Sequence, residues 1–445
     1  MHTSKTILRL LLSITAVIGA TTVHALDVRD FIDRAVTLIE DHQTELARSY
    51  LAPALIAPRL SAGERSRAYY LQGFSFMADN MPVSARKDFN RALEFNPNNA
   101  VVILELGILH AAGRGTVQDE ALALSLFERA ANLGYARANF YLGRAYMYGR
   151  GAEKNIEAAR TALTAAAKEE HTFAMLNLAS SYRIQHVANP QPDLALAWYE
   201  KALAAGEPGA LLSIGFMHAN GEFGTPDMVR SVGYFQRALD EGVQTAAVHL
   251  AYAYMTGTGV KEDYKRALAL YTGAADAGIA ASYVGLGHLF EYGLGVKKNM
   301  VTARQWYEKG ASADEYDAMQ RLVSLHLGED TSEDRALALR WSRRAATNGM
   351  AQSLNDYAWL LATSKFEGLR NGTLALDQAT KAVEDQPTAP FLDTLAAAYA
   401  ELGNFDEAIT IQHEAIAAIA EADGEIRAQL EERLQYYERN EAWRE

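Results

Sequence analysis

The chain has no cysteine among its 445 residues. Disulfide bonds are therefore excluded, and packing alone must stabilise the fold. A lipid anchor of the bacterial lipoprotein type is excluded too, because it needs a cysteine at the new amino terminus. The lack of cysteine is compatible with export from the cytoplasm but does not by itself identify a compartment.

Positive charge is also scarce. Lys and Arg together number 42 against 55 for Asp and Glu, which gives a formal net charge of −13 at pH 7. No tract or stripe of basic residues occurs along the chain. Binding to nucleic acid requires clustered Lys and Arg that release counterions from the phosphates. We therefore expect neither nucleic acid nor an anionic membrane surface among the partners.

Long apolar runs are missing except near the amino terminus. Residues 10–20 form an apolar stretch after Lys5 and Arg9, and this stretch is shorter than the roughly 20 residues of a membrane span. Small or apolar residues at 23–25 complete the pattern of a secretory signal, so we predict cleavage after Ala25 and a periplasmic or secreted protein. An uncleaved anchor or a buried first helix is the alternative. No later segment approaches a transmembrane segment in length.

The sequence does contain a repeat. A small residue that follows Leu or Ile recurs every 36 residues, and an aromatic residue or His comes three positions later. The Leu and the ring then share one face of a helix, and the small residue lets a second helix with its own bulky series approach closely. The small positions are Gly107, Gly143, Ala179, Gly215, Ala251, Gly287 and Val323, and the bulky positions are Phe127, Leu163, Tyr199, Phe235, Tyr271 and Tyr307.

Pairs of glycines follow the first helix of several units. A glycine tolerates the left-handed conformation that ends a helix and reverses the chain. Such a pair can also cradle a phosphate, but here no strand precedes it and the pair recurs with the repeat, which favours a plain turn. The pairs are Gly113 and Gly115, Gly149 and Gly151, Gly257 and Gly259, and Gly293 and Gly295.

Residues 283–311 read YVGLGHLFEYGLGVKKNMVTARQWYEKGA and resemble the Sel1-like repeat. The resemblance covers about residues 100–350 and is specific, because small residues, aromatics and glycine pairs stay in phase. The third unit departs from the pattern, since its turn at 185–192 lacks the glycine pair, and the seventh unit is one residue short. The flanking segments, residues 66–99 and 389–420, resemble tetratricopeptide repeats.

The resemblance implies an all-α fold, a right-handed α-solenoid (superhelix) of stacked antiparallel helix pairs. Each repeat in such a fold is buried against its neighbours, so a long chain need not divide into globular domains. Residues 354–388 resemble a related helix pair, and we expect Trp359 to pack inside it. The predicted order is a signal peptide (1–25), an N-terminal helical cap (26–65), a tetratricopeptide-like repeat (66–99), seven Sel1-like repeats (100–353), two C-terminal tetratricopeptide-like repeats (354–420) and a C-terminal capping helix (421–445).

Two patterns resemble catalytic or metal-binding motifs, and a structural role is expected for both. Ser84 and Lys87 match the Ser-x-x-Lys element of penicillin-recognising enzymes, and some Sel1-like proteins have been linked to β-lactam binding; the companion elements are missing, and Ser84 falls where a helix cap is expected. His110, His218 and His326 recur every third repeat, about 25 Å apart, too far to share one ion. We therefore predict no catalytic residue, no metal and no cofactor.

The candidate binding surface is the face of each first helix opposite the buried one. It comprises the residue two before the small position, the residue after it and the fifth after it. In tetratricopeptide-like solenoids the first helices line the concave groove, so we expect this stripe to face inward. Rings mixed with amides, His and Arg suit a peptide or a carbohydrate; the alternative is that several rings pack against the next repeat. The candidates are Tyr141, Arg144, Tyr148, Asn177, Phe216, Asn220, His249, Tyr252, His288 and Tyr292.

The sequence therefore predicts an exported, non-catalytic scaffold that binds a protein partner through its concave groove. The resemblance implies envelope complex assembly, exopolysaccharide export or envelope signalling as the process. Direct binding of a polysaccharide or peptidoglycan fragment is the alternative function, and a β-lactam-interacting hydrolase is a remote third.

Overall fold

The computed structural model describes residues 28–58, 60–183, 189–329, 331–419 and 423–445. These residues form 23 α-helices and one 3-10 turn, and no β-strand occurs among them. The all-α fold expected from the repeat is therefore confirmed. The predicted signal peptide at 1–25 lies outside the described residues. Of the helices that are described, none is both long and apolar enough to cross a bilayer.

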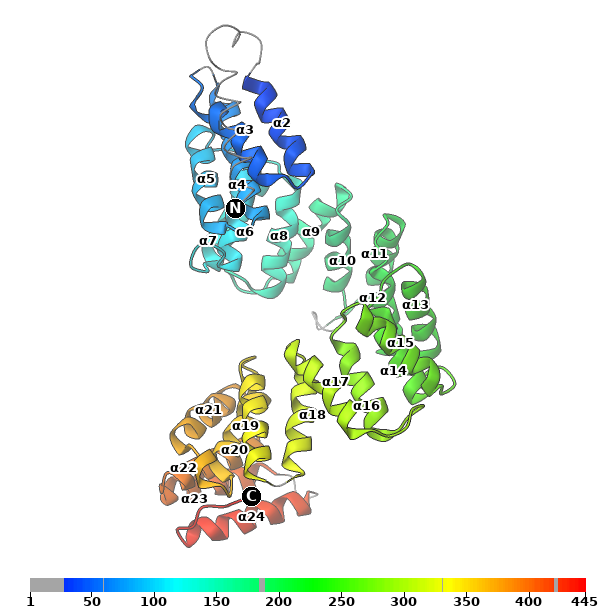
Figure 1. The fold of residues 1–445 in the computed structure, drawn as a ribbon, viewed down its shortest axis with the longest axis vertical. Coiled ribbons are helices and arrows are strands. Elements are labelled where there is room, and N and C mark those ends of the chain that lie inside the picture. Colours follow the sequence, from blue (N-terminus) through cyan, green and yellow to red (C-terminus); the bar gives the residue numbers. More distant parts are fainter. Residues whose placement is uncertain (1–27, 59, 184–188, 330, 420–422) are drawn as a thin grey trace, which may run out of the picture. The chain divides into compact units, whose positions relative to one another are not determined.

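The chain divides into two compact units, residues 1–226 and 227–445. Within each unit every helix packs against the next along the chain, which is the stacking of an α-solenoid (Figure 1). The superhelical handedness stays a prediction. The first unit holds α2 (Val28–Glu40), α3 (Thr44–Ile56), α4 (Ala62–Ala78), α5 (Pro82–Phe95), α6 (Ala100–Ala112), α7 (Glu120–Asn132), α8 (Ala136–Tyr148), α9 (Ile156–Lys168), α10 (Thr172–Ser181), α11 (Pro192–Ala204) and α12 (Ala210–Ala219).

The second unit continues the same alternation. We call the even-numbered helices from α4 to α22 first helices and the odd-numbered helices from α5 to α23 second helices. The second unit holds α13 (Met228–Asp240), α14 (Ala246–Thr256), α15 (Tyr264–Asp276), α16 (Ala281–Tyr292), α17 (Met300–Ser312), α18 (Tyr316–Leu327), α19 (Ser332–Ala346), α20 (Ala351–Thr363), the 3-10 turn η1 (Glu367–Leu369), α21 (Gly372–Asp385), α22 (Ala389–Glu401), α23 (Phe405–Ala418) and α24 (Gly424–Glu438).

The small residues of the first helices receive the bulky residues of the second helices. A Cβ atom added to Gly107 would lie 2.6 Å from the Phe127 ring, and one added to Gly287 would lie 2.2 Å from the Tyr307 ring. No side chain larger than hydrogen fits there without a shift of the ring. The Leu or Ile before the small position is buried in every Sel1-like repeat except the second, where Leu142 is half-buried. In these helix pairs a bulky residue of the second helix therefore packs directly on a small residue of the first helix.

The second glycine of each pair has a role that the plain-turn interpretation does not include. A Cβ atom on Gly151 would lie 2.2 Å from the carbonyl oxygen of Glu120, and one on Gly259 would lie 2.3 Å from that of Met228. Both glycines have positive φ, 78° and 75°. In each case the backbone that is touched is the start of the preceding second helix. The second glycine therefore docks its turn on the hairpin before it.

The third repeat, which lacks the glycine pair, is linked to its neighbour by a buried ion pair. The Nε atom of Arg183 donates to both carboxylate oxygens of Glu222, at 3.0 and 3.1 Å. The side chains of Arg183 and Glu222 are only 8% and 3% exposed. Arg183 also shares a hydrogen bond with Tyr199 of α11. A charge-assisted contact thus joins the end of α10 to the turn after α12.

Two local expectations are wrong. Ser84 does not cap its helix: Met81 holds the N-cap position of α5 and Pro82 the first turn. Proline is preorganised for that position and needs no N–H there, so the helix begins earlier and Ser84 lies within it. Trp359 is half-buried instead of internal: it packs against a buried cluster, and its indole N–H donates to the carboxylate of Glu445.

Asp88 on α5 gives a testable pH dependence. Its side chain is buried and its Oδ2 atom has no hydrogen-bond partner. Burial raises its pKa from 3.8 to about 6, although Lys87 and Arg91 oppose the shift. The folded protein therefore binds more protons than the unfolded chain between these values. The stability that the protonated carboxyl contributes is complete below pH 3.8 and is lost as the pH rises through about 6.

We expect Asp88→Asn to raise the free energy of unfolding by about 2 kcal/mol at pH 7.5. At pH 4 the substitution should change it little, since the native carboxyl is then already neutral. Urea unfolding followed by circular dichroism at the two pH values measures the difference. An equal effect at both pH values would show that Asp88 is not a buried charge.

Candidate functional site

The predicted binding residues lie on five first helices. Those on α8, α10 and α12 belong to the first unit and those on α14 and α16 to the second, so they form two separate sets. That this surface is concave stays a prediction. Tyr141, Arg144 and Tyr148 lie on α8, Asn177 on α10, Phe216 on α12 with Asn220 at its C-cap, His249 and Tyr252 on α14, and His288 and Tyr292 on α16.

The structure brings Tyr141, Arg144 and Tyr148 together in a pocket of about 200 Å³. Ile108 and Ala112 of α6 form the opposite wall. These two residues occupy, in the preceding repeat, the stripe positions that Arg144 and Tyr148 occupy in α8. The pocket is therefore made where the stripes of two successive first helices meet.

The aromatic rings of this pocket differ in their roles. Tyr141 is half-buried and packs on Phe127 at a centroid distance of 5.4 Å, so it forms the floor. Tyr148 is 47% exposed, and the guanidinium of Arg150 lies 5.9 Å from its ring centroid. Tyr148 is the ring that a ligand can reach. The alternative that some rings only pack within the solenoid thus describes much of Tyr141 and little of Tyr148.

The charge of the pocket is opposite in sign to that of the protein. Its lining includes the guanidinium groups of Arg144 and Arg150 and the single carboxylate of Glu120. The whole chain carries a formal net charge of −13. Guanidinium groups bind carboxylates in a planar, two-pronged geometry and also stack on rings. The pocket suits an acidic or aromatic group of a partner.

The other predicted residues of the first unit do not line this pocket. The Nδ2 atom of Asn177 donates to the carbonyl of Phe173, one turn earlier on α10, at 2.8 Å. Phe216 is half-buried and Asn220 is exposed. They lie on the same series of helix faces, outside the lining of the pocket between α6 and α8.

In the second unit, His288 and Tyr292 of α16 form a second cluster with Arg321 of α18, and His249 and Tyr252 lie on α14. The Nε atom of Arg321 on α18 donates to Nε2 of His288 at 3.0 Å, and its Nη1 lies 3.5 Å from the hydroxyl of Tyr292. His249 packs on Phe235 at a centroid distance of 5.2 Å. Tyr252 and Tyr292 are 56% and 53% exposed. Both tyrosines are therefore accessible to a ligand.

The surroundings of His249 and His288 favour the neutral form of both rings. Burial lowers the pKa of His249, and burial together with the nearby charge of Arg321 lowers the pKa of His288. The neutral ring of His288 can accept the hydrogen bond from Arg321 on Nε2. Arg321 thus supplies the positive charge of this surface, and the histidines do not.

Arg321 was not among the predicted residues, although a signal for it exists. It lies two residues before Val323, which is the first stripe position of the seventh repeat. Extending the stripe rule by one repeat identifies Arg321, and extending it backward identifies Ile108 and Ala112. The stripe therefore extends to the first and seventh repeats.

The residues that match catalytic or metal-binding patterns do not line the pocket between α6 and α8. Nδ1 of His326 is 2.9 Å from Oδ1 of Asp334, whose other oxygen, Oδ2, accepts from the hydroxyl of Thr331 at the start of α19. His218 packs on Phe223 at 4.9 Å. Ser84 is half-buried on α5 and Lys87 is exposed. Within the described ranges, no group of three or more His, Asp or Glu residues could hold a metal ion.

Comparison with known proteins finds one family over the repeats. The model of the Sel1 repeat matches residues 101–135, 136–169, 172–207, 208–243, 245–279, 280–315 and 318–350. No curated protein sequence matches the chain.

Among solved structures, a Sel1 repeat protein from Oxalobacter formigenes is 26% identical, with 54% of this chain and 96% of that chain covered and a TM-score of 0.45. The protective antigen c5321 of uropathogenic Escherichia coli, described as having an SLR fold, is 22% identical over 84% and 81% of the chains, with a TM-score of 0.45. Yeast Tom70 is 15% identical over 92% and 95%, with a TM-score of 0.41.

The matched stretches confirm the seven repeats that the spacing of small residues predicts. Each stretch contains two consecutive helices, from α6 and α7 to α18 and α19. Since these stretches together cover more than half of its length, the chain belongs to the Sel1 repeat family.

Proposed function

We propose that the protein is an exported, non-catalytic scaffold that holds a protein partner on its first-helix surface. Sel1 repeat proteins generally act as protein-interaction scaffolds. Export is supported by the signal-like residues 1–25. Envelope complex assembly, exopolysaccharide export and envelope signalling are the processes in which such a scaffold serves.

The observation that supports this proposal most is the pocket between α6 and α8. It combines an exposed ring, Tyr148, with two guanidinium groups, Arg144 and Arg150, at the junction of two repeats. Tyr and Arg are the residue types that contribute most binding energy in protein interfaces. A partner that inserts an acidic or aromatic side chain here would be held by both charge and stacking.

The test is affinity capture from an envelope extract with quantitative mass spectrometry. We expect the double variant Tyr148→Ala/Arg144→Ala to recover at least about tenfold less of the partner than the wild type. Both side chains are at the surface of the pocket, so the variant should remain folded, which circular dichroism verifies.

The matched control is Leu122→Ser/Leu194→Ser. These side chains are 40% and 45% exposed on the second helices α7 and α11. The control should capture the partner as well as the wild type does. Equal recovery with the Tyr148/Arg144 variant would contradict the proposed surface. Binding to a glycan array that is lost with Tyr252→Ala and Phe216→Ala would instead indicate the polysaccharide-binding function.

A further inference from the structure

A larger hollow, of about 640 Å³, lies within the second unit. Its walls come from the first helices α18, α20 and α22, from α24 and from the segment 443–445. We call it the second-unit groove. None of the predicted binding residues lines it, and its lining differs in charge from the pocket of the first unit.

The segment 443–445 is fixed in place as one wall of the groove. The backbone N–H of Glu445 donates to the carbonyl of Thr363 at 2.8 Å, and the N–H of Lys365 donates to the carbonyl of Glu445 at 3.2 Å. Arg444 donates to the carbonyl of Ala362 at 3.1 Å. Trp443 and Glu445 are thereby held against the end of α20.

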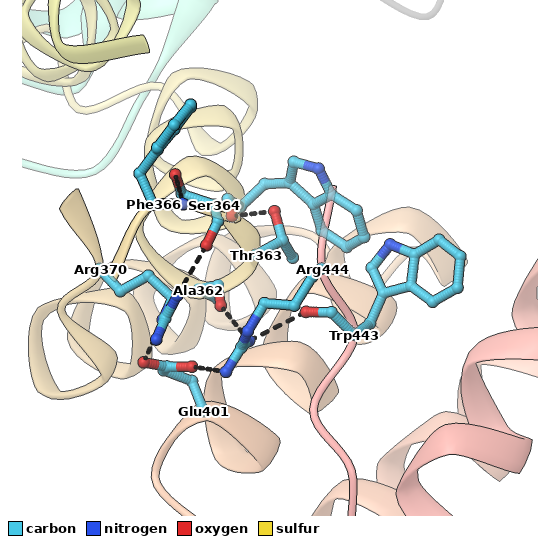
Figure 2. A network of polar contacts seen from close by, with 9 residues as sticks. Ala362, Thr363, Ser364, Phe366, Arg370, Glu401, Trp443 and Arg444 are labelled. Carbon is cyan, nitrogen blue, oxygen red and sulfur yellow. Dashed lines mark hydrogen bonds and ion pairs between the residues drawn. The ribbon is translucent and has the colours of Figure 1, made fainter. Parts of the chain in front are cut away.

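A charged network anchors the same wall from behind. Figure 2 shows the carboxylate of Glu401 between two guanidinium groups, those of Arg370 and Arg444. The Glu401 side chain is 14% exposed, and Nε of Arg370 lies 3.0 Å from its Oε1. A carboxylate that forms ion pairs with two guanidinium groups is held strongly, so this wall of the groove is preorganised without a ligand.

The floor of the groove is a buried ion pair. Nε of Arg433 donates to Oδ1 of Asp393 at 2.9 Å, and Gln412 donates to the same oxygen at 2.8 Å. The guanidinium of Arg433 lies 5.3 Å from the Trp359 ring and 5.9 Å from the Trp443 ring. The one cation of the lining is therefore already neutralised and covered by aromatic rings.

What the groove offers to a ligand is hydrogen-bond acceptors. Asn355 is 6% exposed, and its Oδ1 atom has no hydrogen-bond partner although the residue lines the groove. Beside it, the carboxylate of Asp356 accepts from Gln320 at 3.0 Å and from Gln352 at 2.6 Å. A buried acceptor left without a donor is costly. A ligand that brings N–H groups would satisfy it.

The charge and the apolar side of the groove indicate the chemical class of its ligand. The lining holds three carboxylates, those of Asp356, Asp393 and Glu445, against the single guanidinium of Arg433. Leu327 and Leu360 give it an apolar side that suits a hydrocarbon stem. Burial raises the pKa of Asp356, so a bound cation would relieve the cost of its charge. A Lys or Arg side chain has this combination of cationic donor head and apolar stem.

We propose that the second-unit groove binds a Lys or Arg side chain from a basic segment of a protein partner. The inference rests on the proposed scaffold function for the partner being a protein. The site itself is separate from the pocket between α6 and α8, so one can fail without the other.

The test is fluorescence anisotropy with a fluorescein-labelled peptide of alternating Gly-Ser and Lys-Arg pairs. Two further peptides carry Gln or Glu in place of every Lys and Arg. We expect the full-length protein to bind the basic peptide and neither of the other two. Asp356→Asn and, separately, Glu445→Gln should weaken binding about tenfold, since each removes a charge-assisted acceptor.

Glu384→Gln is the matched control, because it removes the same charge from an exposed position of the second helix α21. It should bind like the wild type, as should Tyr148→Ala of the first-unit pocket. Thermal unfolding monitors the fold of each variant. Binding equally weakened by Glu384→Gln, or equal binding of the Gln peptide, would overturn the proposal. So would a neutral chitin trisaccharide that binds the groove where the basic peptide does not.

Discussion

Glu222→Ala is expected to lower the free energy of unfolding of the first unit by about 3–5 kcal/mol. The substitution leaves the guanidinium of Arg183 without its carboxylate at a position where its side chain is only 8% exposed. Water cannot replace the lost partner there, so the full cost of burying a charge appears. Urea unfolding followed by circular dichroism measures the change, with the transition of the first unit fitted separately.

The matched control is Glu94→Ala, which breaks an ion pair with Arg91 whose side chains are 56% and 52% exposed. Exposed pairs contribute about 0–1 kcal/mol, so this variant should unfold nearly as the wild type does. The double variant Arg183→Met/Glu222→Leu should recover most of the stability, since it removes both charges and keeps the volume. A cost for Glu222→Ala no larger than that for Glu94→Ala would show that the pair is not buried.

The second large effect is expected for Gly151→Ala, which should lower the free energy of unfolding by about 2–5 kcal/mol. An L residue at positive φ costs about 1–2 kcal/mol, and overpacking adds about 1–3 kcal/mol. Here the new Cβ atom would meet the carbonyl oxygen of Glu120 at 2.2 Å and the backbone cannot move aside as a flexible side chain could. The turn between α8 and α9 should then lift from the start of α7.

Gly134→Ala separates the two contributions. Gly134 has φ +85° and no atom within 4 Å of an added Cβ, so only the conformational cost of about 1–2 kcal/mol applies. Amide hydrogen exchange provides the local readout. Gly151→Ala should speed exchange of the backbone amides in the first turn of α7, and Gly134→Ala should not. Equal destabilisation by both variants would mean that the second glycine does not dock its turn.

The fold was largely predictable from the sequence because each core position recurs in several repeats, so an exception in one repeat does not hide the pattern. The same core position is sampled in seven units, so the half-buried Leu142 did not obscure the pattern. Ser84 shows the limit at a single position. The start of α5 is not sampled again in other repeats, so no average corrects it. Pro82 favours the first turn of a helix and sets the start of α5 before Ser84. The winding of the superhelix and the domain boundaries outside the Sel1 repeats stay predictions.

The candidate sites were only partly predictable. The stripe rule found Tyr141, Arg144 and Tyr148, which the structure places in one pocket. It could not find the second-unit groove, since that hollow depends on residues 443–445 returning to α20. No helical period encodes such a return, because the contacts join backbone groups far apart in the chain. Long-range pairing of this kind is visible only in three dimensions.

The backward direction of the glycine contacts bears on how the protein is made. Gly115 touches the backbone of Pro82, Gly151 that of Glu120 and Gly259 that of Met228, so each turn rests on residues synthesised before it. Each hairpin that carries such a glycine therefore meets, as it leaves the ribosome, a neighbour whose docking edge has already emerged. Where the glycine pair is present, growth from the amino-terminal side can proceed one hairpin at a time; the third repeat differs, because Arg183 at the end of α10 waits for Glu222 of the next repeat.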